Sequence, residues 1–150
     1  MKRIVCYLAA LLLLTFSPVE EADIGKLHPV EVVMLYREGN EIVIKTDTDD
    51  WGRGADGLAA LKNLKETTPG TIYLDTAQYL LLGEGGMEWV EQLRPVLKKT
   101  VRVCEAENQI DLQNVTAFLS VHGTLPQLKG WNPGVDLPKL TVVEKRLKMS

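Results

Sequence analysis

Residues 51–86, WGRGADGLAALKNLKETTPGTIYLDTAQYLLLGEGG, constrain the fold of this chain more than any other stretch. Leucines recur at every third position from Leu58 to Leu64, which predicts one face of a helix over residues 55–66. A Pro-Gly pair then stops the helix, because proline cannot continue the hydrogen bonds and glycine turns freely. Residues 79–82 are continuously apolar, which is typical of a strand buried on both faces. The stretch therefore predicts a sheet with helices packed against it.

Segments on both sides of this stretch supply the other strands and helices. Residues 30–36 and 41–46 are rich in β-branched residues and flank a Glu-Gly-Asn turn, which indicates an antiparallel hairpin. Residues 100–105 alternate like a strand, and Asp111 suits the N-cap of a helix behind it. We expect a single α/β (α+β) domain, with a mixed sheet of four to five strands, this N-terminal hairpin and two to three packed helices. The less regular assignments are a polar loop at 47–54, a short strand at 71–74, a helix at 87–98 disturbed by Pro95, a last strand at 140–143 and a loose tail at 144–150.

The N-terminus has the pattern of a segment that directs export. Two basic residues precede an apolar stretch at 4–16, which has the length of a signal-peptide core and is too short for an ordinary membrane-spanning helix. Cleavage after Ala22 would leave an exported domain of residues 23–150, although Glu20 is a poor residue for the −3 position. Residues 1–22 are therefore expected to be either a signal peptide or an N-terminal membrane anchor.

Composition is that of a globular protein and argues against several functional classes. Of the 150 residues, 45% are hydrophobic and 25% are charged, and the net charge of −3 comes from interspersed acids and bases that offer no basic face to nucleic acid. Cys6 lies near the start of the apolar stretch, whereas the lipid-bearing cysteine of a lipoprotein would have to follow that stretch. Removal of residues 1–22 would leave Cys104 without a partner for a disulfide, so the domain would be held by its core.

Residues 52–57, GRGADG, match the letters of the dinucleotide-binding fingerprint, in which glycines let the backbone approach a pyrophosphate at a helix N-terminus. Asp75 follows at about the distance expected of the acid that binds the ribose. The strand before the motif, however, belongs to a hairpin, and the polar residues 47–50 and Trp51 separate it from the first glycine. The chain is also short for both halves of such a fold and would be exported away from NAD. We interpret these glycines as turning residues and expect no cofactor.

Aspartates at positions 47, 49, 50 and 56 suggest a calcium loop at first sight. Gly52 is the sixth residue counted from Asp47, as an EF-hand loop requires. Trp51 is the fifth and Leu58 the twelfth, where a ligand and a bidentate glutamate are needed. A solvated acidic loop is therefore the preferred interpretation, and no metal ligand is assigned.

The residues that most often carry catalysis are few and scattered. His28 and His122 lack the spacing of zinc ligands. Cys104 falls on an expected strand and His122 at an expected helix end near Gly123, and nothing in the sequence brings them together as a nucleophile and its base. We assign no catalytic residue.

The candidate interaction residues lie in two segments that the sequence predicts to be loops. Asp49, Asp50, Trp51 and Arg53 are in the polar loop, and Trp131 is in an irregular segment rich in proline and glycine. Tryptophan and arginine are enriched where proteins contact their partners, whereas core packing is the default for a tryptophan. These five residues form a possible interaction surface.

The order of these elements is similar to a known family. The hairpin, GADGLAALKNL, TIYLDTAQYLLLGEGG, a helix and VRVCEAE together resemble the N-terminal domain of the Ger(x)C-type spore germination proteins over about residues 30–122. The residues that match the family's glycine-started helix and its apolar strand ending in Gly-Glu are Gly54, Ala60, Leu64, residues 79–82, Gly83 and Glu84. The resemblance implies an exported, non-enzymatic module of an endospore-forming bacterium, in or near a membrane receptor assembly. Members of the family are lipoproteins with two further domains, and Cys6 here does not fit a lipid-attachment site.

We therefore expect a non-enzymatic, exported binding or scaffold module at the outer face of the membrane, linked to spore germination or sporulation. Its partners would be proteins at the membrane surface, and it would contact the membrane only through residues 1–22 if they are retained. The alternative is a small exported enzyme or ligand-binding protein that uses the loop of residues 47–57.

Overall fold

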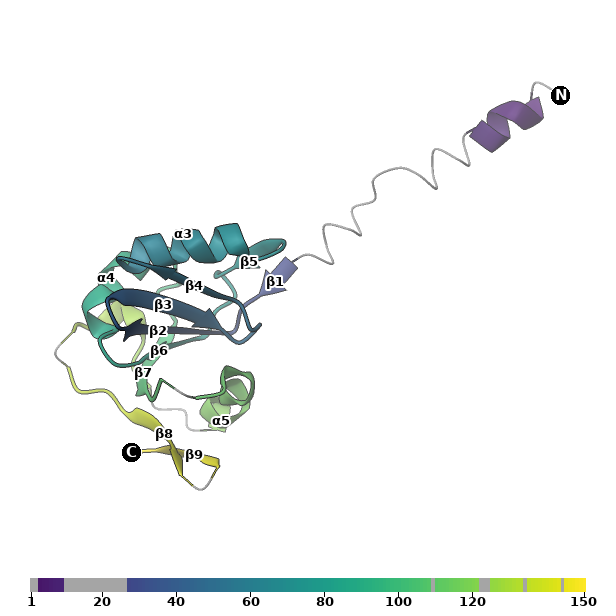
Figure 1. Cartoon of the computed structure of the whole chain (residues 1–150). Coiled ribbons are helices and arrows are strands. Elements are labelled where there is room, and N and C mark those ends of the chain that lie inside the picture. The colour runs from purple at the N-terminus through teal and green to yellow at the C-terminus, as the bar shows by residue number, and fades with distance from the viewer. Residues whose placement is uncertain (1–2, 10–26, 109, 122–124, 134, 144) are drawn as a thin grey trace.

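The computed structural model describes residues 3–9, 27–108, 110–121, 125–133, 135–143 and 145–150. These residues form a mixed α+β fold, as the sequence predicts, built on a seven-stranded sheet with helices on both faces (Figure 1). The sheet has more strands than the four to five that the sequence predicts. Two short strands, β1 (Leu27–Pro29) and β5 (Thr71–Tyr73), pair in parallel outside this sheet.

The main sheet consists, in spatial order, of β4 (Trp51–Gly54), β3 (Glu41–Thr46), β2 (Val32–Glu38), β6 (Tyr79–Leu82), β7 (Arg102–Ala106), β8 (Lys139–Val143) and β9 (Arg146–Met149). Its centre is parallel, because β2, β6, β7 and β8 run in one direction. Both margins are antiparallel: β3 and β4 fold back beside β2, and β9 folds back beside β8. The predicted N-terminal hairpin is confirmed as β2–β3, with Gly39 at a φ of 63° in its turn.

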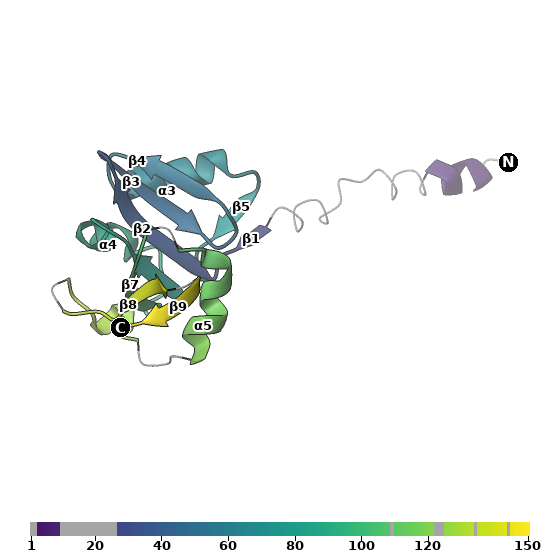
Figure 2. The ribbon, with the colours of Figure 1, turned by 60° about the horizontal axis from the view of Figure 1, so that its bottom comes forward.

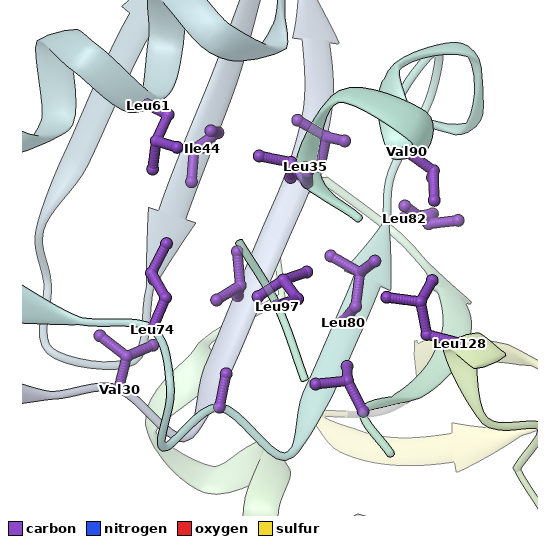
Figure 3. Close-up of a cluster of buried hydrophobic side chains, with 14 of the residues drawn as sticks. Val30, Leu35, Ile44, Leu61, Leu74, Leu80, Leu82, Val90, Leu97 and Leu128 are labelled. Carbon is purple, nitrogen blue, oxygen red and sulfur yellow. The ribbon is translucent and has the colours of Figure 1, made fainter. Parts of the chain in front are cut away.

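One face of the sheet is covered by α3 (Gly57–Thr67), η1 (Met87–Trp89), α4 (Val90–Leu93) and the short η3 (Leu128–Gly130). Figure 3 shows the aliphatic side chains that fill the space between these helices and the strands. Leu35 and Ile44 from the sheet share this cluster with Leu61 of α3, and all three are buried. Strand alternation explains the pattern, since residues two apart on a strand point to the same face.

The other face is covered by η2 (Leu112–Asn114) and α5 (Val115–Val121), as Figure 2 shows from below. Met34 of β2 and Cys104 of β7 pack here with Val115 and Leu119, and each of the four is fully buried. The predicted N-cap is confirmed: the Asp111 carboxylate accepts a hydrogen bond of 3.1 Å from the backbone N–H of Gln113. We call this side of the sheet the second face.

The strongest sequence patterns are confirmed. Helix α3 occupies the segment where the leucines recur, and the four residues of β6 are all buried. The helix expected at 87–98 is broken as predicted: η1 and α4 end at Leu93, two residues before Pro95.

Three assignments differ from the structure. The end of the predicted polar loop is strand β4, which pairs antiparallel with β3. The strand expected at 71–74 does not join the main sheet but pairs with β1. The tail at 144–150 is not loose throughout, because β9 pairs along four residues with β8 and the backbones of Lys139 and Ser150 exchange two hydrogen bonds of 3.0 Å.

Residues 3–9 form a helix whose side chains are exposed. Within the described part of the chain, no helix is long and apolar enough to cross a membrane. The cleavage site expected after Ala22 lies outside the described residues, as do His122 and Gly123, where the sequence predicts the end of a helix.

Candidate interaction groove

Strand β4 sends its small and its large side chains to opposite faces of the sheet. Gly52 and Gly54 lie opposite Ile44 and Ile42 of β3, on the face that α3 covers. A Cβ atom on Gly52 would lie 2.4 Å from the carbonyl oxygen of Ala60 in α3, and one on Gly54 would lie 2.4 Å from the backbone nitrogen of Ala60. These glycines therefore let α3 lie directly on the backbone of β4, and they do not act as turning residues.

The N-terminus of α3, where a phosphate would bind in a dinucleotide fold, is occupied by protein groups. The carboxylate of Asp56 accepts a hydrogen bond of 2.7 Å from the N–H of Ala59. The side-chain oxygen of Gln92 accepts one of 3.1 Å from the N–H of Leu58. Because these two N–H groups already have partners, and because β4 is an antiparallel edge strand, the GRGADG letters do not form a dinucleotide site.

Trp51 and Arg53 project to the second face, where they line a groove of about 520 Å³ between the β3–β4 hairpin and residues 110–112. The buried side chains of Tyr36 and Val43 line its inner part. The groove therefore lies where the second face of the sheet passes from the cover of η2 and α5 to the open hairpin. We call it the β3–β4 groove.

Each of the two basic side chains in the β3–β4 groove lies over an aromatic ring. The guanidinium carbon of Arg53 is 5.1 Å from the centre of the Trp51 ring, and Lys45 Nζ is 5.4 Å from the centre of the Tyr36 ring. Arg53 also reaches the Glu38 carboxylate at 3.4 Å. The Trp51 side chain nevertheless remains 51% exposed. The wall of the groove thus combines aromatic area with a cation that a partner's acidic group can reach.

Hydrogen bonds hold the loop that leads into β4. Thr48 donates a hydrogen bond of 2.6 Å from Oγ1 to the Asp50 carboxylate. Asp47 Oδ1 accepts hydrogen bonds from the backbone N–H groups of Glu31 and Val32, at 3.0 and 3.2 Å. Two of the aspartates that suggested calcium are therefore engaged with protein donors. Among the described residues, no group of three or more His, Cys, Asp or Glu side chains could hold a metal ion.

Four of the five predicted interaction residues come together in the β3–β4 groove, namely Asp49, Asp50, Trp51 and Arg53. The prediction for Trp131 is wrong as to exposure, because that side chain is 2% exposed and belongs to the core beneath η3 and α4. Its indole N–H donates a 3.4 Å hydrogen bond to the carbonyl of Val135, and its own carbonyl accepts one from Arg94. A segment rich in proline and glycine can cover a sheet, and a large indole is then the side chain that fills the space beneath it.

A hollow that the sequence did not predict lies at the carboxyl ends of β6 and β7. It has a volume of about 700 Å³ and is lined by Glu84, Glu105, Glu107 and Lys139, among others. The carboxyl ends of parallel strands are frequent ligand sites. The hollow could therefore have been predicted only if the order of the strands in the sheet had been known. Part of this lining serves the fold, since Asn108 accepts a 2.9 Å hydrogen bond from the N–H of Glu84.

Cys104 lies in the core of the second face, and burial raises the pKa of its thiol to about 12. A thiol with that pKa stays protonated at neutral pH and is a poor nucleophile. His122, its imagined base, lies outside the described residues. The environment of Cys104 therefore gives no support to this thiol as a catalytic nucleophile.

No protein-family model, no curated protein and no solved structure matches this chain.

Proposed function

We propose that this protein is a non-enzymatic binding module that works at the outer face of the membrane and contacts a partner protein through the β3–β4 groove. The observation that carries the proposal is the exposed Trp51 at the wall of the groove, with Arg53 stacked on its ring and tied to Glu38. Aromatic and arginine side chains beside a preformed hollow are the usual anchors of protein–protein binding energy.

The charges around the groove support a polar partner surface. Glu38, Asp49 and Asp50 stand beside the two cations, so acidic and basic groups alternate around the aromatic area. Mixed charge of this kind makes the orientation of a partner specific and contributes less to affinity than a buried aromatic anchor does. The surface of a folded protein carries both acidic and basic groups beside apolar area, and can therefore match the groups around the groove.

The location at the membrane is supported by the sequence. Residues 4–16 fit the apolar core of an export signal or of an anchor. The resemblance to the Ger(x)C N-terminal domain favours a role in spore germination or sporulation, in or near a receptor assembly. Localisation of a tagged full chain in vegetative cells and in spores tests this part, and absence from the sporulating compartment would refute it.

A second candidate function uses the same groove for a small molecule, as a ligand-binding protein or a small exported enzyme. The volume of about 520 Å³ is within the range of small-molecule sites, and it favours this candidate. In that case Asp49→Ala, Asp50→Ala and Arg53→Ala would leave the fold intact and abolish binding or turnover of a defined small molecule.

Photo-crosslinking in the producing cells tests the proposed protein contact. A photoreactive residue replaces Trp51 in one strain and Leu58 in a control strain; Leu58 is 53% exposed but lies on α3. We expect a discrete protein adduct from position 51 that is lost when Arg53→Glu is added, and none of that mass from position 58. Equal adducts from both positions, or none from position 51, would refute the proposal.

A further inference from the structure

The two edges of the main sheet differ in how they are protected. At the β4 edge, α3 lies directly on the strand, as the contacts at Gly52 show. The N–H of Arg53, which points away from β3, donates a hydrogen bond of 2.9 Å to the side chain of Asn63 in α3. This outward N–H is therefore not available to an added strand.

The β9 edge has open backbone groups. Lys139 and Ser150 exchange both of their backbone hydrogen bonds, so alternation turns the N–H and C=O groups of Arg146 and Lys148 toward β8. The same alternation turns those of Leu147 and Met149 outward. Among the described residues, β9 is the last strand of the sheet, and both views place it at the outside of the molecule (Figures 1 and 2).

The side chains of β9 divide into an apolar and a basic side. Leu147 and Met149 are half-buried and pack against the apolar cluster of the second face, which includes Leu140. Arg146 and Lys148 point to the opposite side of the sheet and are exposed. An incoming strand would thus meet two cations on one face and apolar groups on the other.

We propose that β9 binds an extended segment of a partner protein by strand addition, and that this segment carries acidic residues at alternate positions and apolar residues between them. The acidic residues would lie beside Arg146 and Lys148, and the apolar residues beside Leu147 and Met149. The outward backbone groups of these two apolar residues supply the hydrogen bonds common to this mode of recognition. The charge pattern selects the partner.

A second copy of β9 is a poor occupant of the same edge. Antiparallel pairing centred on residue 147 would place Arg146 of one copy opposite Lys148 of the other, and pairing centred on residue 148 would place the two Lys148 side chains opposite each other. Like charges in directly opposed positions destabilise a strand pair. The pattern therefore disfavours self-association and favours an acidic partner.

Titration of the ¹⁵N-labelled full chain with two short peptides tests this proposal. One peptide alternates Glu with Val, and the other alternates Lys with Val. We expect the Glu peptide to bind and to shift the amide signals of Leu147 and Met149, and the Lys peptide to bind about 10-fold more weakly or not at all. Arg146→Glu with Lys148→Glu should reverse this preference, since both side chains are exposed and their replacement leaves the core intact.

The matched control is Lys62→Glu with Lys65→Glu, which changes the net charge equally on the exposed side of α3. This control should keep the preference for the Glu peptide. The proposal is overturned if the Glu peptide does not bind, if charge reversal on β9 leaves the preference unchanged, or if the shifted amides lie at the β3–β4 groove. Self-association of the chain through β9 would also overturn it. The β3–β4 groove lies toward the opposite margin of the sheet, so a failure of the Glu peptide to bind at β9 leaves the proposed function of the groove untouched.

Discussion

Gln113 donates a hydrogen bond of 2.8 Å from Nε2 to the carboxylate of Asp49, joining η2 to the loop before β4 across 64 positions of sequence. The contact joins Asp49, which lines the β3–β4 groove, to the residue that directly follows the groove-lining segment 110–112. It ties together two segments that have no close relation along the chain. The shape of the groove therefore depends on a link that lies in neither strand.

We predict that Gln113→Ala loosens the loop at 46–50 and leaves the fold intact. The hydrogen bond is exposed, so its loss should cost at most about 1 kcal/mol of stability. Hydrogen exchange of the Asp49 amide, which donates to the carbonyl of Thr46, should become faster. Gln127→Ala is the control, at the exposed N-cap glutamine that precedes η3, and equal exchange rates in both variants would contradict the prediction.

We predict that Gly52→Ala destabilises the protein by about 1–3 kcal/mol or more, because the new methyl group meets the backbone of α3. Denaturant unfolding measures the change in free energy. Gly130→Ala is the matched control, since a Cβ at that position meets no atom within 4 Å among those described. A Gly52→Ala protein as stable as this control would show that α3 does not lie on β4 as observed.

The sequence assigns Trp51 and Trp131 to the same interaction surface, but only Trp51 is exposed in the structure, so replacing each should change stability by different amounts. Trp131→Ala removes a buried indole and should cost about 3–5 kcal/mol, measured by thermal or denaturant unfolding. Trp51→Ala removes a half-exposed indole and should change stability by less than about 1 kcal/mol. Similar losses of stability in both variants would contradict the placement of Trp131 in the core.

Cys104 should make the protein less stable as the pH rises from about 9 to about 12. Burial raises the pKa of its thiol from the usual 9.0 to about 12 in the folded protein. Below pH 9 the thiol is protonated in both states, so its contribution is constant. Above pH 9 the unfolded chain loses the proton first, which favours unfolding until the folded thiol also ionises.

Denaturant unfolding of the wild type and of Cys104→Ala over this pH range isolates the effect of the thiol. The difference in stability between the two should shrink as the pH rises, and a constant difference would contradict the prediction. Native protein at pH 8 should also react with a thiol reagent at the exposed Cys6 and spare Cys104 until it is unfolded.

Periodicity predicted the parts of the fold in which local pattern and burial agree. The leucines of α3 and the continuous apolar run of β6 each have one stable environment, so sequence alone placed them. Pro95 predicted the end of α4, because proline has no backbone N–H to continue the helical hydrogen bonds, and tertiary contacts cannot supply one.

Elements that depend on distant contacts could not be predicted in this way. The β9 segment is short and carries two basic residues, and it becomes a strand only because β8 lies beside it. Trp131 is enclosed because the segment around η3 folds over α4, where Arg94 donates hydrogen bonds to the carbonyls of Leu128 and Trp131. The proline and glycine around Trp131 correctly predict an irregular segment, but they do not predict whether its tryptophan side chain is exposed or buried.

The residues of the candidate groove could be predicted from the sequence only in part. Trp51 and Arg53 could be selected from the sequence because large residues in a polar segment are unusual, but their common direction follows from β4 being a strand. The alternation of WGRG, with glycines at every second position, was the available signal. The alternation predicts which face of β4 carries the glycines. It does not predict which element packs on that face, and in the structure this element is α3.

The pairing of β1 with β5 determines how mechanical load enters the domain. Strand β1 is held to the body of the domain by three parallel residue pairs with β5, reinforced by hydrogen bonds from Val30 to Tyr73 and from Thr76 to Val30. The main sheet does not include either strand. Tension on the N-terminal segment would therefore separate the β1–β5 pair first. We expect this separation at low force, while the seven-stranded sheet stays folded.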